Sequence, residues 1–201
     1  MPRVVDRSDT TGDLNGARVP RGDATMNTMR DLDRLAAAAQ AGNSDALDRF
    51  VRSIQSDVWR FCVHLTGGGD ADDLAQEALL RVVTHLDRWE RGPVHTWVLG
   101  VTRNVCFECV SKRSRRRAEP SAEPPMPPEP DARSAIETRA LLAGLPVDQR
   151  EALVLTQLLG LPYAAAAEVV GCPVGTIRSR VARGREALSD ALRAGGDVAE
   201  R

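Results

Sequence analysis

The stretch between residues 161 and 192 constrains the fold of this chain more than any other part of it. The segment from Tyr163 to Val170 is rich in alanine, the strongest helix former, and a Gly-Cys-Pro break follows it. Gly171 suits the left-handed position that ends a helix, and Pro173 is tolerated where the next helix begins. The second helix carries apolar residues on one face, namely Val174, Ile177, Val181 and Leu188. That face is predicted to pack on the first helix.

The opposite face of the second helix is strongly basic. It carries Arg178, Ser179, Arg180, Arg183 and Arg185, opposed in this stretch by Glu186. Two short helices joined by a turn that contains glycine, with a basic second helix, are typical of the helix-turn-helix, whose second helix enters the DNA major groove. The alternative is a solvated helix face, but such faces usually interleave both signs of charge. We therefore predict that this segment binds duplex DNA.

Charge is distributed unevenly along the chain. The formal net charge is only −1, yet a second basic run, from Lys112 to Arg117, precedes the arginines of the last helix. Separated basic patches on a near-neutral chain indicate local phosphate contacts. No apolar run approaches the ~20 residues that span a bilayer, and the N-terminus lacks the apolar region of a signal peptide. We expect a cytoplasmic protein without membrane insertion.

The first half of the chain predicts a small helical domain. Residues 1–29 are polar and without periodicity, which is typical of a disordered tail. Apolar residues at helical spacing then predict four helices, from about residue 32 to 39, 44 to 65, 70 to 89 and 94 to 116. The predicted N-caps of the second and third helices are Ser44 and either Asp70 or Asp72.

A proline-rich segment, residues 118–134, follows with six prolines and predicts a flexible, extended linker. At ~3.1 Å per residue, about 14 such residues reach roughly 43 Å, which exceeds one turn of B-DNA. The linker therefore allows two DNA-binding modules on one duplex, or is a plain spacer. Beyond it, helices near 136–142 and 147–158 precede the helix-turn-helix, and residues 193–201 are read as a tail. The predicted fold is all-α, with two small helical domains.

The four cysteines admit a different interpretation. Cys106 and Cys109 form a C-x-x-C pair, which in other settings binds zinc or acts as a redox switch. A tetrahedral zinc site needs four ligands, and the sequence has neither a second C-x-x-C nor an H-x₃-H. We interpret these cysteines, with Cys62 and Cys172, as small buried side chains. We predict no cofactor, no metal and no catalysis, because nucleotide loops and Ser/His pairs are also missing.

The order of motifs resembles one family. Its most specific parts are Asp72-Asp73-Leu74-Ala75-Gln76-Glu77, then Trp97 with Asn104, then Gly175-Thr176-Ile177-Arg178-Ser179-Arg180. This order, with a linker between the halves, resembles the extracytoplasmic-function (group 4) sigma factors of bacterial RNA polymerase. The resemblance implies sigma region 2 at residues 30–117 and region 4 at 135–192. It implies binding to core RNA polymerase, promoter-specific initiation and control by an anti-sigma factor.

The resemblance also implies residue roles in region 2. The third helix is similar to the part that docks on the β′ clamp helices, through Asp72, Asp73, Gln76, Glu77 and Arg81. Simple capping and solvation are the alternative. The fourth helix and its loop are similar to the part that opens and reads the −10 element, through Trp89, Trp97, Arg103, Asn104 and Lys112. Flat side chains and cations are what capture an unstacked strand. Trp97 lies on the apolar side of its helix, so core packing is favoured over base stacking for it, and Trp89 in the polar loop is the better stacking candidate.

Region 4, by the same resemblance, reads the −35 element as duplex. Thr176, Arg178, Ser179 and Arg180 lie early on the helix and would reach bases, whereas Arg183 and Arg185 would hold phosphates. The helix that contains Val154, Leu155 and Leu158 is similar to the one that cradles the β-flap tip, but core packing is the favoured role for at least two of these residues. Glu108 and Ser111 depart from the family pattern and leave the −10 specificity open. The competing function is a stand-alone helix-turn-helix regulator, against which the paired domains and the linker argue.

Overall fold

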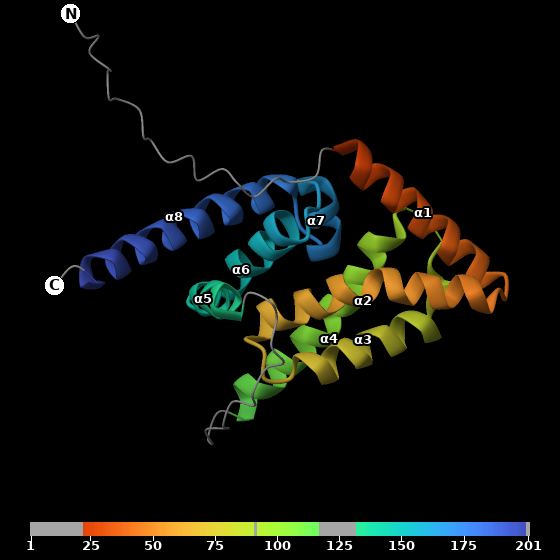
Figure 1. The fold of residues 1–201 in the computed structure, drawn as a ribbon, viewed down its shortest axis with the longest axis horizontal. Coiled ribbons are helices and arrows are strands. Elements are labelled where there is room, and N and C mark those ends of the chain that lie inside the picture. The colour runs from red at the N-terminus through yellow and green to blue at the C-terminus, as the bar shows by residue number, and fades with distance from the viewer. Residues whose placement is uncertain (1–21, 91, 117–131, 200–201) are drawn as a thin grey trace, which may run out of the picture.

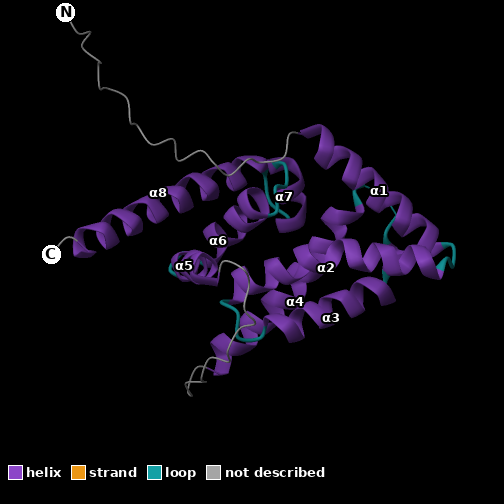
Figure 2. Cartoon of the chain, in the orientation of Figure 1, coloured by secondary structure: helices purple, strands orange, loops and turns teal. Residues whose placement is uncertain are grey.

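The computed structural model describes residues 22–90, 92–116 and 132–199, with side chains described for 29–90, 92–111 and 138–193. Within these ranges the chain is helical and has no strand, which confirms the all-α prediction (Figure 2). The first unit contains α1 (Gly22–Gln40), α2 (Ser44–Thr66), α3 (Ala71–Thr84), the 3₁₀ turn η1 (Leu86–Arg88) and α4 (Val94–Arg116). The second contains α5 (Ala132–Ala143), α6 (Val147–Leu153), the π-helical η2 (Val154–Leu158), α7 (Tyr163–Val170) and α8 (Val174–Ala199).

Helix α2 is the centre of the first unit, and α1, α3 and α4 pack around it. Its apolar residues recur at intervals of three and four, and Phe50, Ile54, Val58 and Phe61 are fully buried. Burying side chains of this kind contributes about 1.5–3 kcal/mol each. Gly67 ends the helix in the left-handed conformation, with φ of 84°. One central amphipathic helix thereby fixes the positions of α3 and α4.

The second unit contains the predicted helix-turn-helix. Helix α7 ends at Gly171, whose φ of 73° confirms the left-handed turn, and α8 begins at Val174. Ile177 and Val181 are buried, so the predicted apolar face of α8 packs inward. The basic face of α8 is consequently turned outward.

The two units pack against each other (Figure 1). Helix α7 contacts α4, and both α5 and α6 contact α2. The buried apolar residues of the two units form one continuous cluster. Hydrogen bonds also cross between them: the guanidinium of Arg60 donates to the Leu158 carbonyl at 3.3 Å, and that of Arg150 donates to the Leu65 carbonyl at 3.0 Å. The two helical units are therefore joined by tertiary contacts as well as by the linker.

Helix ends differ from the predicted ones in several places. Asn43, not Ser44, caps α2, because its Oδ1 accepts a hydrogen bond from the Ala46 amide at 3.0 Å. Asp70 holds the N-cap position of α3 but its side chain makes no capping hydrogen bond, and α3 ends at Thr84 instead of near residue 89. Asp70, one of the two predicted alternatives, is therefore the N-cap residue of α3, although it caps the helix without a side-chain hydrogen bond.

Three helices extend into segments that were predicted to be irregular. Helix α1 begins at Gly22 within the predicted tail, α5 begins at Ala132 within the predicted linker, and α8 continues to Ala199. The glycines near the end of α8 do not stop it, because a glycine inside a helix costs only about 1 kcal/mol. Composition alone overestimated the irregular regions.

Candidate nucleic-acid interface

Helix α3 presents a mixed acidic and apolar surface. Its buried side consists of Ala75, Ala78 and Val82, and its predicted polymerase-binding residues Asp72, Asp73, Gln76 and Glu77 are exposed. Leu80 is 62% exposed on the same helix, a large apolar side chain that sequence analysis assigned to no surface. The sequence does contain a signal for it: Leu79 and Leu80 are adjacent, and two adjacent residues of an amphipathic helix cannot both lie at the centre of its buried face. An exposed leucine beside carboxylates is suited to a protein partner.

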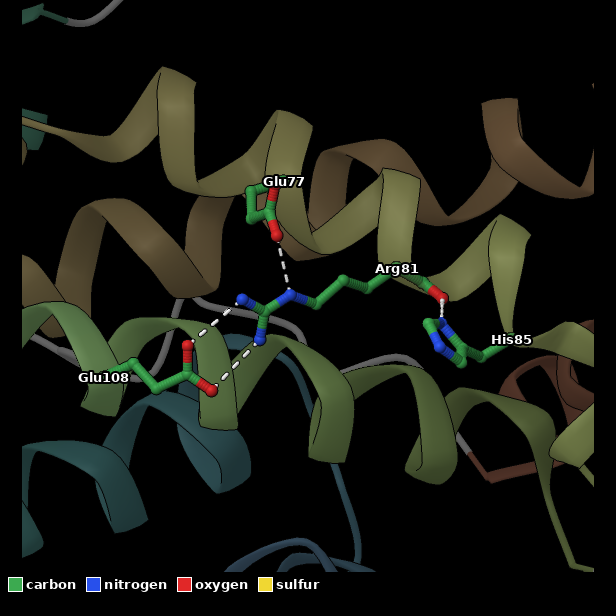
Figure 3. Close-up of polar contacts among 4 residues, drawn as sticks. All are labelled: Glu77, Arg81, His85 and Glu108. Carbon is green, nitrogen blue, oxygen red and sulfur yellow. Dashed lines mark hydrogen bonds and ion pairs between the residues drawn. The ribbon is translucent and has the colours of Figure 1, made fainter.

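Arg81 ties α3 to α4 (Figure 3). Its Nε lies 2.6 Å from a Glu77 carboxylate oxygen, and its two terminal nitrogens donate to the two Glu108 oxygens, each at 3.1 Å. The hydrogen bonds to Glu108, and then to Glu77, raise the pKa of Arg81 and keep it charged. This bidentate geometry fixes the orientation of the guanidinium. Because the Arg81 side chain is 35% exposed, the ion pair between Arg81 and Glu108 contributes little to the stability of the fold.

The predicted −10 residues lie on α4 and the loop before it. Trp89 is half-buried, and its indole Nε1 donates to the Gly92 carbonyl at 3.1 Å. Trp97 is half-buried and Asn104 is exposed, and both line a cavity of about 370 Å³. Glu168 and Val169 of α7 line the same cavity. Trp97 thus packs against the core and still borders an opening, while the Lys112 side chain lies outside the described ones.

Arg103 does not point to open solvent. Its Nε lies 2.5 Å from a Glu151 carboxylate oxygen on α6, and its guanidinium stacks over the Phe107 ring at 4.3 Å. Glu151 is only 1% exposed, and burial raises its pKa although Arg103 opposes the shift. Sequence analysis missed Glu151, because in its helix it reads as an ordinary polar position. The contact joins residues 48 positions apart in the sequence.

The predicted −35 residues lie on the first turns of α8. Arg178 and Arg183 are exposed, Thr176 and Ser179 are half-buried, and the Ser179 hydroxyl donates to the Thr176 carbonyl at 2.9 Å. Arg180 is half-buried and forms an ion pair with Asp148 of α6 at 3.3 Å. The structure therefore gathers the predicted arginines on one helix, with Arg180 held by an internal partner.

Two of the four cysteines are small side chains in the core of the first unit, as predicted. Cys62 and Cys106 are fully buried, with sulfur atoms 3.6 Å apart. The hydrogen bond between them, followed by burial, raises the pKa of the Cys106 thiol. Cys109 and Cys172 are only partly buried. Among the described residues, no three potential metal ligands gather in one place.

Comparisons with known proteins match each of the two helical units to a known family. The family profile for Sigma-70 region 2 matches residues 50–116, and that for Sigma-70, region 4 matches residues 135–188. The chain is 45% identical over 172 residues to the ECF RNA polymerase sigma factor SigC of Mycobacterium tuberculosis, covering 82% of this chain and 93% of that one. The chain belongs to the extracytoplasmic-function sigma factors. SigD of the same organism is 34% identical over 191 residues, covering 87% and 90%.

Solved structures of sigma factors share the fold. The sigma factor RpoE of Bartonella quintana, solved with the anti-sigma factor NepR, matches with a TM-score of 0.60 at 26% identity, covering 85% of this chain and 97% of that one. CnrH, solved with the cytosolic domain of CnrY, matches with a TM-score of 0.66 at 24% identity, covering 82% and 98%. As a sigma factor, this protein binds core RNA polymerase and directs transcription initiation at promoters. None of its described helices is long and apolar enough to cross a membrane.

Proposed function

We propose that this sigma factor divides its work between two modules, residues 30–117 and residues 135–192. The first binds core polymerase and the −10 element, and the second reads the −35 element. The observation that carries this proposal is the outward placement of two dissimilar surfaces, the acidic and apolar face of α3 and the arginines of α8. Both modules act without catalysis of their own, in the cytoplasm where core polymerase works.

In this proposal α3 is the main contact with the β′ clamp helices. Asp72, Asp73, Gln76 and Glu77 supply charge complementarity to a basic partner, and Leu80 supplies an apolar anchor beside them. Arg81 has a different part, because Glu77 and Glu108 already occupy its nitrogens. It orients the carboxylate of Glu77 and joins the polymerase-binding helix to α4.

The −10 element is proposed to meet α4 and its loop as separated single strand. Trp89 and Trp97 offer flat faces for unstacked bases, and Asn104 offers an amide to a base edge. Arg103 and Lys112 supply the cations that follow the backbone. Strand capture of this kind needs the α4 surface to be open.

The −35 element is proposed to meet α8 as duplex. Arg178, Thr176, Ser179 and Arg180 lie on its first turns, where a recognition helix reaches base edges. An arginine bidentate to guanine contributes about 1–3 kcal/mol of discrimination against the wrong base. Arg183, one turn further on and exposed, is positioned for a phosphate.

Two protein partners of the second unit are proposed as well. An apolar groove of about 240 Å³ lies between α5, α6, η2 and α8, and its lining includes Leu141, Leu142, Leu153, Leu158, Leu188, Leu192 and Arg185. Such a groove is suited to an amphipathic helix, and we assign it to the β-flap tip. Because the similar RpoE was solved with an anti-sigma factor, we also propose an anti-sigma partner for this chain.

Run-off transcription tests the proposal. Core polymerase is incubated with fragmented genomic DNA, with and without this protein, and the 5′ ends of the transcripts are sequenced. New start sites preceded by a shared pair of elements are expected only when the protein is present. The absence of any new start site would refute the proposal, and tight binding to duplex without polymerase would favour the stand-alone regulator.

A further inference from the structure

Two side chains of α1 reach the connection between η1 and α4, which begins at Trp89 and ends at Pro93. This connection carries Trp89, one of the residues proposed to meet the −10 strand. Gln40 bonds to it from 49 positions away in the sequence, and Asp33 bonds to the first residue of α4 from 61 positions away. Sequence analysis assigned neither residue a role. Their contacts place both of them behind the proposed −10 interface.

The side-chain amide of Gln40 bonds to two carbonyls at the start of the connection. Its Nε2 donates to the Leu86 carbonyl at 2.7 Å and to the Trp89 carbonyl at 2.9 Å. Because a carbonyl can only accept, the nitrogen of the amide faces both groups, and each of its two hydrogens has one acceptor. Gln40 therefore fixes the backbone of the turn before Trp89 and the backbone of Trp89 itself.

Asp33 caps the other end of the connection, where α4 begins. The Pro93 carbonyl accepts the Thr96 amide at 3.0 Å, so Pro93 stands at the N-cap position, and a proline side chain has no acceptor for the first amides of the helix. The Asp33 Oδ1 accepts from the Val94 amide at 2.8 Å in its place. A carboxylate also stabilises the positive end of the helix dipole. Helix α1 therefore supplies the cap that a local Ser or Asp usually supplies.

The two residues act from one side of α1. Asp33 and Gln40 are seven positions apart, which is two helical turns, and Ala36 between them is fully buried. Helix α1 accordingly packs on both η1 and α4 (Figure 1). The Trp89 indole in turn donates to the Gly92 carbonyl, and Gly92 makes this turn with a φ of 79°. The place of the indole relative to α4 is thus set from α1.

We propose that Gln40 and Asp33 are positioning residues for −10 recognition, which hold Trp89 and the first turn of α4 in one place so that bases are read in one register. This inference rests on the proposed role of Trp89 and α4 in strand capture. Neither Gln40 nor Asp33 touches DNA in it. A side chain that is held before DNA arrives loses less freedom on binding. It also rejects a wrong base better, because it cannot move to accommodate that base.

Substitutions of Gln40 separate positioning from stability. Gln40 is an exposed residue, so water can replace its amide at the two carbonyls, and both Gln40→Ala and Gln40→Glu should fold with a Tm close to that of the wild type. Gln40→Glu keeps the shape of the side chain, but its ionised carboxylate cannot donate and would face two carbonyl oxygens. Its effect should therefore be the larger. Gln55, an exposed glutamine of α2, provides the matched controls Gln55→Ala and Gln55→Glu.

The hold on Trp89 can be measured without DNA. Trp59→Phe and Trp97→Phe leave Trp89 as the one remaining tryptophan of three. In this background the quenching of Trp89 fluorescence by acrylamide should rise in both Gln40 variants and stay unchanged in both Gln55 variants. Far-UV circular dichroism checks that helix content is kept. Unchanged quenching in the Gln40 variants would show that α1 does not hold the indole, and would overturn the proposal while the sigma-factor function stands.

The effect on recognition is measured as a ratio within one reaction. Core polymerase and the full chain, with its tryptophans intact, transcribe a promoter found by the run-off assay, mixed with all of its single-base −10 variants. A second pool varies the −35 element. The preference for the original −10 sequence over its variants should fall by roughly threefold to tenfold in Gln40→Glu, the change expected from losing one or two hydrogen bonds. The −35 preference and the affinity for core polymerase should stay at the wild-type level. The amount of folded protein cancels from each ratio, so a purely structural role would move neither.

Substitutions of Asp33 add a rescue. Asp33→Asn keeps an oxygen that can accept from the Val94 amide and should keep the −10 preference, whereas Asp33→Ala should lower it. Asp31→Ala, at an exposed carboxylate of α1, is the matched control. An unchanged −10 preference in both Gln40→Glu and Asp33→Ala, or an equal fall in the −10 and −35 preferences, would overturn the positioning role. A wild-type chain without any −10 preference would instead refute the proposed function.

Discussion

The close packing of α8 on α6 gives a sharp test of how the recognition helix is held. Gly184 is buried inside α8, and a Cβ added there would lie 2.7 Å from Leu153 Cδ1 and 3.2 Å from Leu153 Cγ. Leu153 is itself only 4% exposed, so its side chain has little room to turn away. We expect Gly184→Ala to push α8 off α6, the helix that carries the partner of Arg180.

The magnitude follows from two opposing effects. Replacing glycine by alanine in a helix interior stabilises the helix by about 1 kcal/mol. Forcing a methyl group into a packed core costs about 1–3 kcal/mol. The net effect of Gly184→Ala is therefore a loss of about 1 kcal/mol. Gly100→Ala is the matched control, because Gly100 lies inside α4 with no atom within 4 Å of an added Cβ, and it should gain about 1 kcal/mol.

Thermal unfolding followed by circular dichroism separates the two variants. For a protein of this size, 1 kcal/mol corresponds to about 2–4 °C in Tm. Gly184→Ala should unfold a few degrees below the wild type, and Gly100→Ala a few degrees above it. A Gly184→Ala protein as stabilised as Gly100→Ala would show that α8 does not lie against Leu153, and the placement of the recognition helix would be wrong.

Other substitutions address the proposed surfaces directly. Asp73→Arg should weaken binding to core polymerase at least about tenfold in a fluorescence-anisotropy titration, with unchanged Tm, because it reverses an exposed charge; unchanged affinity would remove α3 from the interface. Arg180→Ala should cripple run-off initiation while leaving core affinity intact, and an equal loss of core affinity would contradict its assignment to the −35 element. Glu108→Gln should cost only about 0.5–1 kcal/mol of stability, since the pair it forms with Arg81 is partly exposed, and a larger loss in urea unfolding would show that the pair supports the fold. Ile177→Ala should lower stability by about 2–5 kcal/mol, because the side chain is fully buried, and a Tm close to the wild type would place α8 in a different register.

Local features of the fold could be predicted from the sequence with good success. The apolar repeat of α2, the left-handed turn at Gly171 and the buried Ile177 and Val181 all depend on residues within one or two helical turns of each other. Periodicity and turn chemistry act at that range, so they are visible in a linear pattern. The grouping of the −35 residues on one helix follows for the same reason.

Helix ends were less predictable, and the physical reason is competition between weak local preferences. Ser44 and Asn43 are both good caps, and a difference of a few tenths of a kcal/mol decides between them. The glycines near the end of α8 cost too little to stop a helix that has already formed.

Long-range partners belong to the tertiary structure alone. The sequence by itself determined which segments become helices, which faces they bury and which arginines share a side of α8. Packing decided that Arg81 would meet Glu108, that Arg103 would meet Glu151 and that α7 would cover α4. Each of these contacts joins residues far apart in the chain, and their distance is set by how whole helices stack. The pairing of an arginine is therefore a property of the assembled fold, whereas its position on a helix is a property of the sequence.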